Sequence, residues 1–206
     1  MTKVSNEGVE RALANPVVAR LAAGLRSHTP RVLPLDPSWR RAAVSLVMRV
    51  DGDDDPDVLF IRRASYAGDP WSGHIALPGG RHEAGDATLE ETAVRETREE
   101  TAIDLAAASV LLGRLDDLEP RTVVLPRIVI SPFVFAMWGE PVVVPSEEVA
   151  EAFWVPLSVL RDPASAREAE IELPGGVRRV TSYQHEGRVI WGLTERVVRQ
   201  FLALAR

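Results

Sequence analysis

The chain has 206 residues, of which 46% are hydrophobic and 26% charged, and its formal net charge is -6. This composition is typical of a globular domain with a substantial core, and the negative charge disfavours nucleic acid, whose phosphates are bound by basic surface. The sequence has no cysteine, which excludes disulfides and thiolate metal sites.

The sequence also lacks the features of a membrane or secreted protein. It has no run of about 18 apolar residues that could span a bilayer. Its first residues lack the basic and then apolar order of a secretory signal. We therefore expect a cytoplasmic protein with no membrane partner.

The first segment, Glu7 to Arg26, has the periodicity of a helix. Its apolar residues recur every four positions, at Val9, Leu13, Val17, Leu21 and Leu25. Pro16 interrupts this ladder, so the segment predicts one broken helix or two short ones. The proline-rich stretch from Thr29 to Pro37 then predicts a connector. We expect residues 1–40 to form a helical extension packed on a domain that spans residues 41–206.

Two short apolar runs, Ala42 to Val50 and Val58 to Arg62, predict paired strands around an acidic loop. A glycine-rich segment from Gly68 to Gly80 follows and contains Trp71. Trp71 fits two roles equally well, a core aromatic residue at the base of a loop or a flat platform for a ligand.

The stretch from Leu77 to Ile103 carries the strongest chemical signal. A Pro-Gly-Gly turn leads into a helix with Glu96, Glu99 and Glu100. A helix turns about 100° per residue, so these three carboxylates share one arc of its surface. They repel one another, and a hard divalent cation such as Mg²⁺ or Mn²⁺ would balance them. The alternative is a solvated helix face of alternating charges.

After this helix, the chain predicts further strands and a final amphipathic helix. Ser109 to Leu115 has the pattern of a strand, and Thr122 to Trp138 predicts one long strand or two. Pro126 and Pro132 lie within the latter and predict a sheet edge or a bulge. Short strands are also expected at 153–155, 171–173, 177–183 and 189–191, and a helix at 192–205.

The central stretch resembles the Nudix box, G-x5-E-x7-R-E-U-x-E-E-x-G-U, where U is apolar. The corresponding residues are Gly80, Asp86, Arg95, Glu96, Glu99, Glu100 and Ile103. Asp86 replaces the first glutamate and lies one residue further from Arg95, Thr97 replaces an apolar residue and Ala102 replaces the glycine. The longer loop resembles the coenzyme A pyrophosphatase subgroup of the superfamily.

The resemblance implies an α+β fold, an α/β/α sandwich with a mixed central β-sheet flanked by helices. It also implies Mg²⁺-dependent (or Mn²⁺-dependent) hydrolysis of a pyrophosphate bond in a nucleoside diphosphate derivative. Coenzyme A or an acyl-CoA would be the substrate, cleaved to 3′,5′-ADP and phosphopantetheine.

Roles for individual residues follow from the same resemblance. The metal ligands would be the Gly80 carbonyl, Glu96, Glu99 and Glu100. The catalytic residues would be Glu99, Arg95, which orients a glutamate of the box, and Glu148, which acts as base from a later loop. The substrate contacts would be Arg63, Trp71 and Arg81.

Other functions fit the same residues. One alternative is a Nudix pyrophosphatase of ADP-ribose, NADH or a nucleotide sugar, because Gly68-Asp-Pro-Trp-Ser72 stands where typical coenzyme A members carry a basic, histidine-rich run. Another is a binding module that keeps the fold without catalysis, although three mutually repelling carboxylates argue against it. The sequence leaves open whether the protein forms a homodimer.

Overall fold

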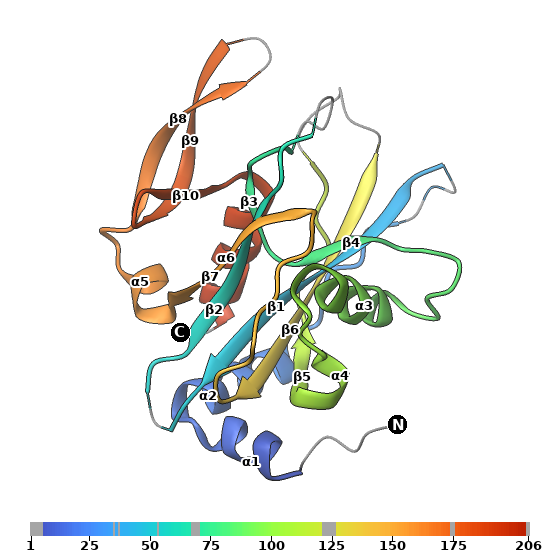
Figure 1. The fold of residues 1–206 in the computed structure, drawn as a ribbon, viewed down its shortest axis with the longest axis vertical. Coiled ribbons are helices and arrows are strands. Elements are labelled where there is room, and N and C mark those ends of the chain that lie inside the picture. Colours follow the sequence, from blue (N-terminus) through green and yellow to red (C-terminus); the bar gives the residue numbers. More distant parts are fainter. Residues whose placement is uncertain are drawn as a thin grey trace.

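A mixed β-sheet runs through the middle of the protein, and helices cover both of its faces (Figure 1). The computed structural model describes residues 6–34, 36, 38–52, 54–66, 71–120, 127–173 and 176–204. Within these ranges the helices are α1 (Asn6–Ala14), α2 (Pro16–Ser27), α3 (Leu89–Thr101), α4 (Leu105–Ala108), α5 (Leu157–Arg161) and α6 (Gly192–Leu204). None of them combines the length and apolar character needed to cross a lipid bilayer.

The central sheet has seven strands, which are β1 (Arg40–Val50), β2 (Asp57–Arg63), β3 (Ile75–Ala76), β4 (Gly79–Arg81), β5 (Ser109–Arg114), β6 (Ile128–Trp138) and β7 (Val149–Pro156). The main strand order is β3-β2-β1-β6-β5, with β4 paired to β1 and β7 paired to β2. β1 and β6 run parallel, and the other pairs are antiparallel. The sheet is therefore mixed, as predicted.

Strand β1 shows how the two layers of helices are held on the sheet. Its side chains alternate between the two faces, as the period of a strand requires. Leu46 and Met48 join a hydrophobic cluster with α2 and α6. Ala43 and Val47 join a second cluster with α3. This arrangement confirms the predicted α/β/α sandwich.

A smaller three-stranded sheet follows the central one, with strands β8 (Ala166–Leu173), β9 (Gly176–His185) and β10 (Arg188–Trp191) in the order β10-β9-β8. Figure 1 shows the β8–β9 arm standing away from the central sheet. The predicted strand at 171–173 is thus only the end of a longer strand that begins at Ala166.

The N-terminal segment forms two helices that meet at Pro16, one of the two forms predicted. Asn15 caps α2, because its side chain accepts hydrogen bonds from the Val17 and Val18 N–H groups at 3.0 and 3.2 Å. Proline is well suited to the first position of a helix, where its missing N–H costs nothing. The division of the chain at residue 40 remains a prediction.

The expectation of a sheet edge at Pro132 was wrong, although the β5–β6 pair does contain a register irregularity nearby, between Leu111 and Gly113. β6 lies between β1 and β5, inside the sheet. The Pro132 carbonyl accepts a hydrogen bond from the Leu115 N–H at 3.0 Å, just beyond the end of β5. A proline is tolerated here because its missing N–H faces the point where β5 ends. Pro126 and the rest of 122–126 lie outside the described residues.

Candidate active site

Helix α3 carries the acidic residues on one side because its other side is buried against β1. The Thr88 side chain caps its start by accepting a hydrogen bond from the Glu91 N–H at 3.1 Å. Leu89 and Ala93 belong to the hydrophobic cluster that includes β1. The arc with the three predicted glutamates is thereby turned away from that cluster.

A buried serine on β1 links α3 to the turn that precedes it. The Ser45 N–H donates to the Pro78 carbonyl at 2.8 Å. The Thr97 hydroxyl donates to the Ser45 hydroxyl at 2.8 Å, and Ser45 in turn donates to the Ala93 carbonyl at 3.0 Å. The turn and the helix are therefore held at a fixed separation through one residue.

The two glycines of the turn make room for the glutamates of α3. Gly79 has φ 152°, and its N–H donates to Glu100 Oε2 at 2.8 Å. A Cβ at Gly79 would overlap the Ala43 carbonyl, whereas a Cβ at Gly80 would overlap the Glu96 carboxylate. Glycine is needed at Gly79 because backbone atoms approach so closely, whereas a side chain at Gly80 would displace the Glu96 carboxylate from its position.

Arg95 is the centre of an ion-pair network. Its Nε lies 2.9 Å from Asp86 Oδ1, Nη1 lies 2.9 Å from Glu99 Oε2, and Nη2 lies 3.1 Å from Glu96 Oε1. Nη2 also donates to the Arg81 carbonyl at 3.0 Å. The Arg95 guanidinium holds the pKa of Asp86 well below its usual range, and its hydrogen bonds with Asp86 raise the pKa of Arg95.

Glu100 has a different environment, because it is only 3% exposed. Burial raises the pKa of this carboxyl to about 7, in spite of the Gly79 N–H and the Arg63 cation, which lower it. Arg63 Nη1 lies 4.0 Å from Glu100 Oε1. The charges of Glu96 and Glu148 raise this pKa further.

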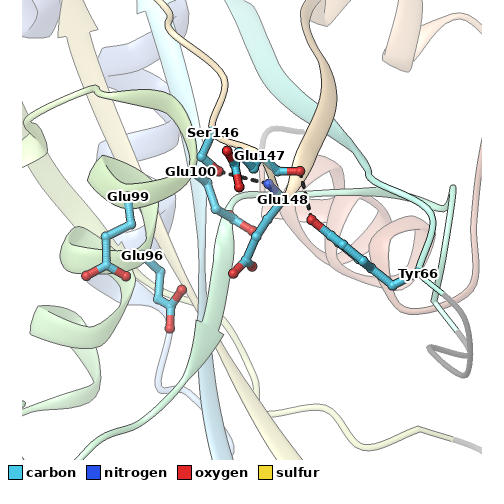
Figure 2. Close-up of a pocket in the computed structure, with 7 residues that line it drawn as sticks. All are labelled: Tyr66, Glu96, Glu99, Glu100, Ser146, Glu147 and Glu148. Atoms are coloured by element: carbon cyan, nitrogen blue, oxygen red, sulfur yellow. Dashed lines mark hydrogen bonds between the residues drawn. The ribbon is translucent and has the colours of Figure 1, made fainter.

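These carboxylates meet at a cleft of about 400 Å³, which we call the acidic cleft. Its lining residues are Tyr66, Glu96, Glu99, Glu100, Ser146, Glu147 and Glu148. Figure 2 shows glutamates from α3 on one side and those of the loop before β7 on the other. Burial raises the pKa of Glu96, and the charges of Glu99 and Glu148 add to this effect.

Comparisons with known proteins agree with this geometry. A family model described as the NUDIX domain matches residues 39–173. A Nudix hydrolase named NudL from Yersinia pestis is 32% identical over 162 residues, which cover 78% of this chain and 77% of that protein. The chain belongs to the NUDIX domain family.

Two further matches are consistent with this assignment. An uncharacterized protein of Schizosaccharomyces pombe is 33% identical over 167 residues, which cover 72% of this chain and 50% of that protein. The chain thus spans half the length of this yeast relative. A MutT/nudix family protein from Enterococcus faecalis has the same fold, with a TM-score of 0.52 at 18% identity, covering 90% of this chain and 68% of its own.

The donors of this Nudix site fit a hard divalent cation by their chemistry. In the described parts of the chain, no three carboxylate or imidazole groups lie close enough to hold a metal ion as they stand. The acidic cleft nevertheless offers only oxygen donors, which Mg²⁺ and Mn²⁺ prefer. Burial and mutual repulsion raise the pKa values of Glu96 and Glu100, and a bound cation would relieve this repulsion.

The structure brings together part of the predicted site. Glu96, Glu99, Glu100 and Glu148 all line the acidic cleft, and Gly80 lies against Glu96. Arg95 reaches Glu99 as expected.

The predicted substrate contacts lie outside the cleft lining. Arg63 stands beside Glu100, the half-buried Trp71 lies in a turn before β3, and Arg81 is exposed at the end of β4 and contributes its carbonyl to Arg95. Their roles toward substrate remain predictions.

Sequence reasoning missed Tyr66 and Ser146 in the lining of the cleft. Tyr66 follows β2 and precedes the glycine-rich segment, so an aromatic residue in that connection was the available signal. Ser146 precedes Glu147 and Glu148, and its hydroxyl accepts a hydrogen bond from the Glu148 N–H at 3.3 Å. Gly68, Asp69 and Pro70 of the glycine-rich segment lie outside the described residues.

Proposed function

We propose that this Nudix hydrolase cleaves the pyrophosphate bond of a nucleoside diphosphate derivative, with Mg²⁺ as cofactor and coenzyme A or an acyl-CoA as substrate. The observation that carries the proposal is the convergence of Glu96, Glu99, Glu100 and Glu148 on one cleft, where burial and mutual repulsion raise the pKa values of Glu96 and Glu100. Both this cleft and a diphosphate are negative, so binding requires a cation between them.

The cation would be held by the carboxylates of Glu96, Glu99 and Glu100 and by the Gly80 carbonyl. When bound, it would neutralise charge on the diphosphate and polarise its phosphoryl oxygens. Arg95 positions this set, because it holds Glu96 and Glu99 at 3.1 and 2.9 Å. Glu99 would therefore contact two cations, the Arg95 guanidinium and the bound metal ion.

Glu148 would act as the general base that takes a proton from the attacking water. It comes from the opposite side of the cleft, and its backbone is fixed at two points. Its N–H donates to the Ser146 hydroxyl at 3.3 Å, and its carbonyl accepts from the Ala64 N–H at 2.8 Å. A rigid backbone keeps a base in line with its substrate. Glu147 is the alternative base on the same loop.

One observation favours a second group of substrates, which includes ADP-ribose, NADH and nucleotide sugars. The sequence from Ala64 to Ser72 contains no lysine or arginine and one aspartate. It therefore supplies no cation for the additional phosphate that distinguishes coenzyme A from these compounds.

The test is to incubate the protein with Mg²⁺ and a panel of coenzyme A, ADP-ribose, NADH and a nucleotide sugar, and to identify the products. Turnover of coenzyme A should release phosphopantetheine and 3′,5′-ADP. Glu148→Gln should slow the reaction by about 100-fold, the contribution of a general base. Hydrolysis of none of these compounds, or hydrolysis that continues in excess EDTA, would overturn the proposal.

The same preparation allows the oligomeric state, which the sequence leaves open, to be measured. Sedimentation equilibrium would give twice the chain mass of 22.6 kDa for a homodimer and the mass of one chain for a monomer.

A further inference from the structure

Tyr66 places an aromatic ring at the opening of the acidic cleft. It is 51% exposed and lines the cleft together with the glutamates. Figure 2 shows it on the side of Glu147 and Glu148, across the cleft from Glu96 and Glu99. The ring is thus separated from the glutamates of α3 by the cleft itself.

Hydrogen bonds hold Tyr66 at both ends. At its backbone, the Tyr66 N–H donates to the Ser72 hydroxyl at 3.0 Å, and this hydroxyl donates back to the Tyr66 carbonyl at 2.9 Å. At its tip, the Tyr66 hydroxyl donates to the Glu147 carbonyl at 2.9 Å. The ring therefore bridges two loops and has a defined orientation although it faces solvent.

The fold gains little from placing the ring there. Tyr66 belongs to neither of the two hydrophobic clusters, and an aromatic ring left half in water contributes only part of its burial energy. Among the described residues that line the cleft it is also the only apolar surface, since the others are glutamates and Ser146. A fixed, exposed ring in such surroundings is suited to a planar ligand group.

We propose that the face of Tyr66 stacks against the nucleobase of the substrate, and this proposal rests on the proposed function for the diphosphate part of that substrate. The carboxylates and their cation would take the diphosphate, which carries the charge. The base is planar and uncharged, and Tyr66 offers it an aromatic face within the same cleft.

The hydrogen bond from the Tyr66 hydroxyl to the Glu147 carbonyl also predicts how the site discriminates between nucleobases. The hydroxyl proton of Tyr66 is committed to the Glu147 carbonyl, so the cleft offers the base a ring face rather than this donor. Stacking on a ring face tolerates different bases, because every base has a π-face. We therefore expect adenine and guanine nucleotides to bind with similar affinity at this position.

The test uses calorimetric binding of ADP and of ribose 5-phosphate, both in Mg²⁺, to the wild type, Tyr66→Leu and Tyr66→Phe. Tyr66→Leu keeps an apolar side chain without the ring and should weaken ADP binding by about tenfold, a typical stacking contribution. Tyr66→Phe keeps the ring and should change it by at most about threefold, the effect of one exposed hydrogen bond. Ribose 5-phosphate has no base and should bind all three proteins alike.

Three results would overturn the inference. The first is ADP binding that is unchanged in Tyr66→Leu, and the second is an equal loss of affinity for ADP and ribose 5-phosphate in that variant. The third is a loss of ADP affinity in Tyr66→Phe as large as that in Tyr66→Leu, which would assign the effect to the hydrogen bond between the Tyr66 hydroxyl and the Glu147 carbonyl. Binding is measured without turnover, so a protein that hydrolyses nothing can still show the ring effect. Conversely, turnover of the substrate panel with unchanged ADP binding in Tyr66→Leu would leave the proposed function standing and remove only the role of Tyr66.

Discussion

Two groups of charges lie around the same turn of α3, and they are balanced in different ways. The paired side consists of Asp86, Arg95 and Glu99, where a guanidinium contacts both carboxylates at 2.9 Å. The unbalanced side consists of Glu100 and Glu148, where burial and repulsion raise the pKa of Glu100 to about 7. The paired side has its cation in direct contact with the carboxylates, whereas on the unbalanced side Arg63 lies 4.0 Å from Glu100 and does not offset the burial of that carboxyl. The first is therefore expected to stabilise the fold, and the second to act on substrate.

The largest effect is expected on catalysis, from Glu100→Gln on the unbalanced side. On the proposed mechanism this substitution removes a cation ligand, and several kcal/mol of transition-state stabilisation correspond to a loss of about 1,000-fold in kcat/KM. Steady-state hydrolysis in Mg²⁺ measures it. Glu90→Gln, at an exposed position in the first turn of the same helix, is the matched control and should keep full activity. A loss below about tenfold for Glu100→Gln would show that Glu100 does not hold the cation.

On the paired side, Asp86→Asn should mainly reduce stability. The Asp86 side chain is 6% exposed and holds Arg95 through two contacts. Breaking a buried pair by neutralising one partner costs about 3 kcal/mol, measurable as a lower midpoint of urea unfolding. Glu83→Gln, on the exposed loop beside Asp86, serves as control. An Asp86→Asn variant as stable as wild type would mean that the pair contributes nothing net.

The pH dependence of stability should run in opposite directions on the two sides. The pKa of Glu100 is raised from 4.5 to about 7 in the folded protein, so the folded state binds more protons and unfolding free energy falls as pH rises through this window. The loss is at most about 3 kcal/mol in metal-free protein. The pKa of Asp86 is lowered, so its contribution is present above about 3.8 and is lost as pH falls below that value.

Urea unfolding in EDTA at a series of pH values measures whether the unfolding free energy changes with pH in the two predicted directions. Glu100→Gln should remove the decline between pH 4.5 and 7 and should make the metal-free protein more stable at pH 8. A decline that persists unchanged in this variant would assign it to other groups.

The smallest effect on stability is expected from a substitution at the C-terminal end of α3, which alters neither group of charges. Ala102 ends the helix with φ 61°, a left-handed conformation that glycine adopts without strain. Ala102→Gly should therefore stabilise the protein by about 1 kcal/mol, seen as a higher melting temperature, while kcat and KM stay unchanged. A lower melting temperature would show that the methyl group contributes packing that outweighs the strain.

The glutamate arc on α3 could be predicted from spacing alone, because residues three and four apart share a helix face regardless of the rest of the fold. The contact of Arg95 with Glu99, one helical turn away, was predictable in the same way. The hydrogen bond from the Gly79 N–H to the buried Glu100 was not, because it depends on where β1 places the turn before the helix.

Sequence was least informative where contacts are remote or local preference is overruled. Glu148 was proposed from a family resemblance, and Tyr66 was not proposed at all, since the cleft joins them from segments about 80 residues apart. The strand at Ala166–Glu170 was missed because its alanine, arginine and glutamate residues favour a helix. Pairing with β9 decides its conformation instead.

The hydroxyls of Thr97 and Ser45 share one acceptor, the Ala93 carbonyl, and this arrangement affects how the protein can change in evolution. Both hydroxyls are fully buried. Each hydroxyl reaches the Ala93 carbonyl directly, Ser45 at 3.0 Å and Thr97 at 2.7 Å, so replacing one of them leaves the other with its acceptor. A buried hydroxyl that keeps an acceptor avoids the cost of about 1–3 kcal/mol for an unsatisfied polar group, so homologous chains should be able to vary at each of the two positions independently. The backbone hydrogen bond from Ser45 to Pro78 needs no side chain, so such a change would keep the glycine turn at the same distance from the helix.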